Sequence, residues 1–158
     1  MFNMSFKDEK TLKVSAIKNG TVIDHIPSNC LFKVISLLRL DKVENPITFG
    51  SNLDSGKLGS KAIIKITDVF FEDSDINKIA LIAPQVKLSI IKDYNVVEKK
   101  VVKVPDEVVG LAKCFNPHCI SNHEDITTRF HVLTDNGDIE LKCKYCEKIT
   151  DQERMVLL

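Results

Sequence analysis

Alternating apolar and polar residues mark several short strands in the first two thirds of the chain. Leu12, Val14 and Ala16 alternate with polar neighbours, as in a strand with one buried face. Asn19 and Gly20 follow and predict a tight turn, because both residue types tolerate a positive φ. The predicted strands cover residues 11–17, 21–25, 46–49, 62–66, 86–90 and 95–99.

Two segments instead show apolar residues at helical spacing. The first begins near Ser28, which we expect to be its N-cap, and the second begins after Asp73 and ends at Pro84. Each helix should bury one apolar face. The apolar positions are Leu31, Val34, Ile35 and Leu38 in the first helix and Ile76, Ile79, Ala80 and Ala83 in the second.

The segment from Gly50 to Leu58 superficially resembles a phosphate-binding P-loop. However, five residues separate Gly50 from Gly56 instead of four, and Leu58 stands where a metal-binding Ser or Thr is required. The pattern therefore predicts a hairpin loop between the strands at 46–49 and 62–66.

The order of these elements predicts an α+β fold of the ferredoxin-like, split βαβ type, with an antiparallel sheet and both helices on one face. The other sheet face is then solvated or covered by a second copy of the chain. Apolar residues expected on that face favour a homodimer; they are Val22, Ile64, Val86 and Val96.

A basic strand end, Pro105 and a reversal of charge mark a domain boundary. We therefore expect one domain over residues 1–105 and a second, small all-β domain over residues 106–158. In the second, strands at 127–134 and 138–142 flank Asp135-Asn136-Gly137, a strong hairpin signal.

The composition narrows the class of protein. The chain has 158 residues, 44% of them hydrophobic, with no apolar run long enough for a membrane and no signal-peptide pattern at Met1, so we expect a soluble cytoplasmic protein. The two halves differ in charge: residues 1–105 carry 16 Lys and Arg against 12 Asp and Glu, and residues 106–158 carry 6 against 10. An acidic C-terminal domain favours a protein partner over nucleic acid, whereas the basic half could hold a small anion.

Four cysteines give the C-terminal domain its candidate chemistry. Four residues separate Cys114 from Cys119 and two separate Cys143 from Cys146, which is a spacing typical of a tetrahedral zinc site. Four thiolates would close the coordination shell, so the site would be structural. The alternatives are two disulfides or unrelated thiols, and His118 replacing one ligand. We expect Cys30 to be buried as a small apolar residue.

Several stretches in order along the chain resemble the regulatory chain of aspartate carbamoyltransferase. The most specific is the string GTVIDHIP within residues 16–27. The cysteine spacing is also similar to that of the family. The other matching stretches are residues 64–66, 81–85, 116, 119–121 and 141–148.

The resemblance implies a regulatory subunit without catalytic activity. The N-terminal domain would pair with a second regulatory chain and bind nucleoside triphosphates, with CTP and UTP inhibiting and ATP activating. The zinc domain would dock onto the catalytic chain, giving a hetero-oligomer that regulates pyrimidine synthesis. The implied nucleotide-binding residues are Ala16, Ile17, Val22, Asp24, His25, Lys65, Ile91, Tyr94, Val96 and Lys99. The implied zinc ligands are Cys114, Cys119, Cys143 and Cys146, and the implied docking residues are Asn116, His118 and Glu147.

Two departures from the family pattern stand out. Ser89 and Ile90 replace an Asn-Arg pair beside the base, and His118 replaces an asparagine of the first zinc loop. Two rival functions are a zinc-ribbon nucleic-acid-binding protein and an enzyme acting on a phosphorylated substrate. The acidic zinc domain weakens the first, and the absence of a recognisable catalytic set weakens the second.

Overall fold

The computed structural model describes residues 16–56, 59–135 and 137–158. The described residues form two compact units, divided between Val102 and Lys103. Among the described residues, no helix is long and apolar enough to cross a membrane.

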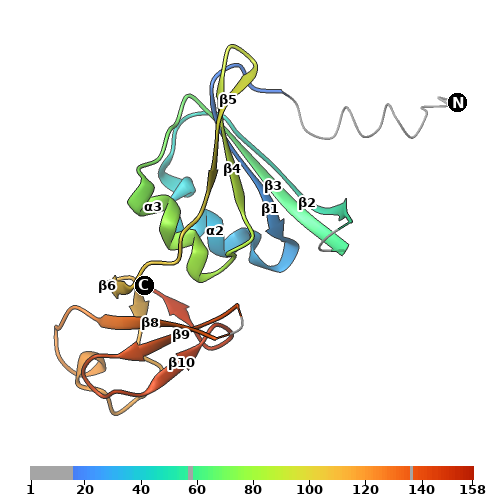
Figure 1. Ribbon diagram of the computed structural model, residues 1–158. Coiled ribbons are helices and arrows are strands. Elements are labelled where there is room, and N and C mark those ends of the chain that lie inside the picture. The colour runs from blue at the N-terminus through green and yellow to red at the C-terminus, as the bar shows by residue number, and fades with distance from the viewer. Residues whose placement is uncertain (1–15, 57–58, 136) are drawn as a thin grey trace, which may run out of the picture. The chain divides into compact units, whose positions relative to one another are not determined.

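The first unit is a five-stranded antiparallel sheet in the order β2-β3-β1-β4-β5. Two helices, α2 and α3, lie on the same face of this sheet (Figure 1). This is the predicted split βαβ arrangement, extended by one edge strand, β5. The elements are β1 Gly20–Pro27, η1 Ser28–Cys30, α2 Leu31–Leu37, η2 Leu40–Lys42, β2 Ile47–Ser55, β3 Gly59–Thr67, α3 Asp73–Lys78, η3 Ile79–Leu81, β4 Lys87–Lys92 and β5 Asn95–Val101.

An aliphatic core fills the space between the sheet and the two helices. The sheet contributes residues such as Ile23, Ile64 and Leu88, all fully buried. Six of the eight apolar positions predicted for the helices are buried, and Ile35 and Leu38 pack partly buried against the core cluster. The second helix is shorter than predicted, because α3 ends at Lys78 and a 3-10 turn, η3, follows it. Burial of each large aliphatic side chain stabilises the domain by about 1.5–3 kcal/mol.

The hairpin predicted at Asn19 and Gly20 is wrong. The first part of the predicted strand, residues 11–15, lies outside the described residues, while Ala16 and Ile17 belong to no strand. Both edges of β1 are occupied, by β3 and β4. Gly20 is needed for a different reason, because a Cβ there would collide with the Ile66 carbonyl of β3.

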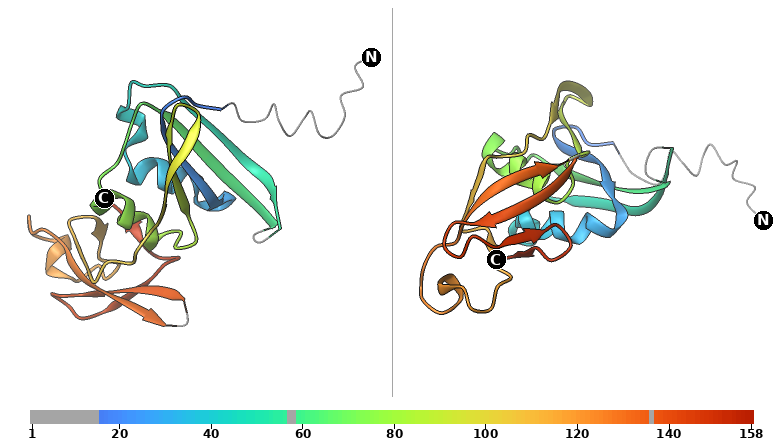
Figure 2. Two further views of the ribbon diagram at one scale, coloured as in Figure 1. Left: turned by 45° about the horizontal axis from the view of Figure 1, so that its top comes forward. Right: turned by 60° about the horizontal axis from the view of Figure 1, so that its bottom comes forward.

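The loop predicted over residues 50–58 is also wrong in extent. β2 continues to Ser55 and β3 begins at Gly59, so the two strands form the long hairpin seen in Figure 2. Lys57 and Leu58 lie outside the described residues. A register shift between Gly50 and Leu53 and a positive φ at Asn52 form a bulge in the hairpin. The mostly polar sequence hid these strands, because only buried faces impose alternation.

Two smaller predictions for the first unit are corrected as well. Ser28 does not cap α2, which begins at Leu31 after the short η1 turn, with no side-chain cap. Two of the four apolar residues expected on the open sheet face, Ile64 and Val86, belong to the core instead. Val22 is partly buried and Val96 is 51% exposed.

The second unit consists of short strands around a small core. Its four-stranded sheet has the order β10-β9-β8-β6, and β7 pairs with β11. The predicted hairpin joins β8 and β9, with Asp135 opposite Asp138, although Asn136 lies outside the described residues. The elements are β6 Glu107–Val109, β7 Ala112–Lys113, η4 Ile120–Asn122, β8 Arg129–Asp135, β9 Asp138–Cys143, β10 Ile149–Asp151 and β11 Val156–Leu157.

Candidate functional site

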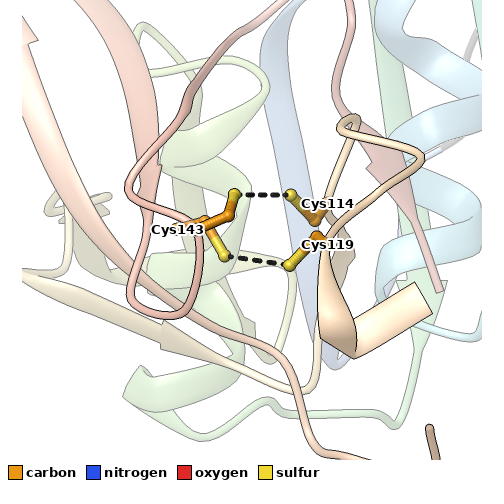
Figure 3. Close-up of side chains that lie close together, drawn as sticks. Cys114, Cys119 and Cys143 are labelled. Atoms are coloured by element: carbon orange, nitrogen blue, oxygen red, sulfur yellow. Dashed lines mark hydrogen bonds between the residues drawn. The ribbon is translucent and has the colours of Figure 1, made fainter. Parts of the chain in front are cut away.

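The four cysteine sulfurs of the second unit form one cluster. All four lie within 4.8 Å of one another, and the Cys114–Cys146 and Cys119–Cys143 sulfur pairs are each 3.7 Å apart. Figure 3 shows the thiols of Cys114, Cys119 and Cys143 pointing toward a common centre. Zn–S bonds of about 2.3 Å in a tetrahedron place sulfurs about 3.8 Å apart, whereas a disulfide requires about 2.05 Å. The spacing fits a tetrahedral metal and not two disulfides.

Two turns supply these thiols. Cys114 follows β7 and Cys119 precedes η4, whereas Cys143 ends β9 and Cys146 lies in the turn after it. In the second turn, the Glu147 N–H donates to the Cys143 carbonyl at 2.9 Å, and the Tyr145 N–H approaches the Cys143 sulfur at 3.4 Å. Backbone N–H groups pointing at sulfur favour the thiolate form that a metal needs.

Asn122 ties the first cysteine turn together. Its side-chain amide donates to the Cys114 carbonyl at 3.0 Å and to the Asn116 carbonyl at 2.7 Å. The Asn116 side chain in turn accepts a hydrogen bond from the His118 N–H at 3.1 Å and is only 8% exposed. Asn122 was not singled out from the sequence, because an asparagine three residues after a cysteine has no distinctive pattern.

The surroundings set the protonation of the cluster. Burial raises the pKa of the Cys114 and Cys143 thiols. Burial also acts to raise the pKa of Cys146, but hydrogen bonds from the Lys148 backbone and the Asn116 side chain, together with the neighbouring thiols, lower it to about 7. A cation that replaces the protons would remove the cost of burying these groups as thiolates. Four such ligands leave no open coordination position, so the centre is suited to holding structure and not to catalysis.

Most of the predicted nucleotide-binding residues lie on the face of the sheet opposite the helices. Strand pairing sets Val22 of β1 between Lys65 of β3 and Ser89 of β4, and Ser89 opposite Lys99 of β5. Partial burial lowers the pKa of Lys65, and the charge of Asp24 acts in the opposite direction.

The next positions along the same strands bring together further predicted nucleotide-binding residues. Ile91 pairs with Val96, and Tyr94 lies in the turn between them with a φ of 67°. The Tyr94 N–H donates to the Lys18 carbonyl at 2.9 Å, which holds this turn beside the segment that contains Ala16 and Ile17.

A shallow pocket of about 390 Å³ opens at the other end of this face. His25 enters it from a bulge in β1, with a φ of 60°. Asp24 accepts a hydrogen bond from the His25 N–H at 2.6 Å and pairs with Lys61 at 3.0 Å. Lys87 and Lys100 also line this pocket, and sequence reasoning missed both. The alternation Lys87-Leu88-Ser89 would have placed Lys87 on this face. The lining residues are Asp24, His25, Lys87, Leu88, Ser89, Lys99, Lys100 and Val101.

The predicted docking residues lie in the two cysteine turns. His118 and Glu147 are exposed, and Glu147 has a φ of 64°. Asn116 is buried within its turn. Their contact with a catalytic chain stays a prediction.

These features define a two-domain protein, with an α+β domain that has a basic open sheet face and a β-rich domain with a four-cysteine centre. Comparison with known proteins gives the family. The family model described as aspartate carbamoyltransferase regulatory chain, allosteric domain, matches residues 12–103, and the model for the metal binding domain of the same chain matches residues 106–156. The protein belongs to the aspartate carbamoyltransferase regulatory chains, and it is therefore a regulatory and not a catalytic chain.

Relatives match over nearly their whole length. The regulatory chain of Parabacteroides distasonis is 53% identical over 154 residues, covering 98% of this chain and 99% of the relative. That of Bacteroides fragilis is 53% identical over 152 residues, covering 96% and 99%. That of Pyrococcus abyssi is 46% identical over 147 residues, covering 92% and 96%.

Proposed function

We propose that this chain controls a cytoplasmic aspartate carbamoyltransferase by binding nucleoside triphosphates, with CTP and UTP inhibiting and ATP activating. The nucleotide site would lie in an allosteric domain, residues 1–105, and the docking site for the catalytic chain in a zinc domain, residues 106–158. The observation that carries the proposal is the alignment of Lys65, Val22, Ser89 and Lys99 across one open sheet face of the domain that matches the allosteric family model.

Each part of a nucleotide has a chemical partner on this face. Lys99 and His25 would bind the triphosphate, because charge-assisted hydrogen bonds are the strongest available to phosphate oxygens. Asp24 and Lys65 would bind ribose hydroxyls or base edges. The backbone near Ile17 and Tyr94 would read the base, with Ile91 and Val96 packing beside it.

In the second domain, Cys114, Cys119, Cys143 and Cys146 would hold one Zn²⁺. The ion would supply cross-linking between the two cysteine turns, and so would fix the loops that carry Asn116, His118 and Glu147 against the catalytic chain. Two regulatory chains would pair through their allosteric domains.

Regulation would then work without contact between effector and substrate. A nucleotide shifts the equilibrium between two arrangements of the complex only by its difference in affinity for them. Inhibitor and activator would share one pocket, in which the triphosphate supplies affinity and the base supplies the difference.

The proposal is tested by coexpressing this chain with the catalytic chain of its organism and measuring the mass of the complex and its activity with CTP, UTP and ATP. Lys99→Ala should weaken all three nucleotides together by about 1.5–3 kcal/mol, the cost of a lost charge-assisted contact. Activity without nucleotide should not change. Lys33→Ala, an exposed lysine on α2, is the control. Failure to assemble with the catalytic chain would refute the proposed regulatory function. Loss of the response to one nucleotide only, in Lys99→Ala, would refute the shared pocket.

A further inference from the structure

Lys87 is a lysine of the open sheet face to which none of the roles above assigns a function. It is the first residue of β4, pairs with Asp24 of β1 and Val101 of β5, and lines the same pocket as His25 and Lys99. Its neighbour Leu88 is buried in the core, so the alternation of the strand directs Lys87 to the open face.

The charges around Lys87 show that its ammonium group is available to a ligand. Asp24, the one carboxylate that lines the pocket, is already paired with Lys61 at 3.0 Å and accepts the His25 N–H. Lys100 is held by Asp73 at 2.9 Å. Across the described residues, neither Lys87 nor Lys99 takes part in an ion pair with a carboxylate, so the pocket presents two unneutralised lysines side by side with His25.

We propose that Lys87 binds the terminal phosphate of the nucleotide, and that it lets the pocket distinguish triphosphates from diphosphates. The inference rests on the proposed function, in which Lys99 and His25 bind the phosphate chain. Lys99 of β5 lies opposite Ser89 of β4, and Lys87 is two residues from Ser89 along β4, a distance of about 7 Å. Its flexible four-carbon stem reaches a phosphate group one or two positions beyond the one at Lys99.

This position separates Lys87 from Lys99 in function. Along β4, the end that carries Ile91 comes first, then Ser89 with Lys99 opposite, and then Lys87 at the start of the strand. Lys99 would therefore contact phosphates that di- and triphosphates have in common. Lys87, farther from the proposed base site at Ile91, would contact only the group that a diphosphate lacks. A lysine that is merely solvated at the end of a strand would instead have the same small effect on both ligands.

The test is calorimetric titration of the full-length chain with CTP, CDP, ATP and ADP. Lys87→Met keeps most of the aliphatic stem and removes the charge, Lys87→Arg keeps the charge, and Lys33→Met on the helix-covered side is the matched control. In Lys87→Met we expect the dissociation constants of CTP and ATP to rise about tenfold. Those of CDP and ADP should change less than about twofold, and Lys87→Arg should restore most of the difference.

Equal weakening of di- and triphosphates in Lys87→Met, or no weakening of either, would overturn this role of Lys87 while leaving the proposed function intact. Absence of nucleotide binding to the unmodified chain would overturn the proposed function and this inference with it. A loss that also appears in Lys33→Met would show a general charge effect and would likewise refute the proposal.

Discussion

The two domains of this chain solve the problem of stability in different ways. Among its described residues, the allosteric domain has 13 buried apolar residues in one continuous cluster between its sheet and helices. The buried apolar residues described in the metal-binding domain are few: Val108, Ala112, Phe130, Ile139 and Leu141, beside the thiols of Cys114, Cys119 and Cys143. Domains of about 60 residues are marginally stable because they bury a small share of their surface, and those below about 40 residues usually need a metal, disulfides or oligomerisation. One domain can therefore rely on its core, while the other depends on its four-cysteine centre.

The largest effect is expected from removing one metal ligand, which tests whether only the metal-binding domain depends on the four-cysteine centre. Cys143→Ser should unfold the metal-binding domain, because metal binding supplies folding free energy on the order of 10 kcal/mol at comparable sites. The allosteric domain should stay folded and keep binding nucleotide. Bound zinc, measured by elemental analysis, and the dispersion of amide resonances in each domain would report the two outcomes.

Cys30→Ser serves as the matched control, because this fifth cysteine lies in η1 of the other domain and outside the cluster. It should leave the zinc content unchanged. Two results would contradict the dependence of the second domain on its metal centre. One is a full-length chain without stoichiometric zinc, and the other is a Cys143→Ser chain that still assembles with the catalytic chain.

The next largest effect is expected from truncating the core of each domain. Leu88→Ala should lower the free energy of unfolding of the allosteric domain by about 2–5 kcal/mol, since Leu88 is fully buried. Leu141→Ala should cost a similar amount in the zinc-loaded metal-binding domain and nothing after chelation, when that domain is already unfolded. Urea titrations with and without chelator, followed separately for each domain, would measure this. A cost for Leu141→Ala that persists in chelator would show that the domain folds without metal.

Burial explains how much of the fold could be predicted from the sequence. The helices and inner strands were predictable, because core positions such as Leu31 and Ile76 repeat at the period of their element. The outer part of the β2–β3 hairpin was not, because residues such as Asn52 and Asp54 face solvent and leave no period to detect. The turn at Gly20 misled for another reason: its glycine serves close packing against β3, which only the folded sheet reveals.

A smaller effect is expected from the hydrogen bonds that hold the first cysteine turn. Asn122→Ala removes both bonds to the Cys114 and Asn116 carbonyls without touching a ligand. Loss of such supporting contacts typically weakens metal binding about 10–100-fold. Competition with a zinc chelator would measure the change, with Glu124→Gln, an exposed neighbour, as control. An unchanged affinity would mean that the four thiolates alone position the turn.

Residues of the candidate sites could be predicted only where their chemistry requires a fixed spacing along the sequence. The four cysteines were identified by their intervals, and their sulfurs do meet in one cluster. Lys61 and Lys87 were not identified, because a lysine in a strand has no spacing signature. Their relevance appears only when strand pairing places them beside Asp24. The sequence indicates Asn116 only as a contact with another chain and gives no sign of its buried position in the cysteine turn.

The smallest effect is expected at Ser28, where the sequence suggested a helix cap. The Ser28 hydroxyl instead donates to the Ser60 hydroxyl at 3.1 Å and accepts the Asn52 N–H at 3.2 Å, so it links the start of η1 to the β2–β3 hairpin. Ser28→Ala should cost only about 0.5–1.5 kcal/mol, the net value of an ordinary hydrogen bond, because the apolar core beneath is untouched. The location of the change is the sharper test. Amide hydrogen exchange should accelerate at Asn52 and remain the same along Leu31–Leu37, whereas loss of a true cap would accelerate exchange in the first turn of α2.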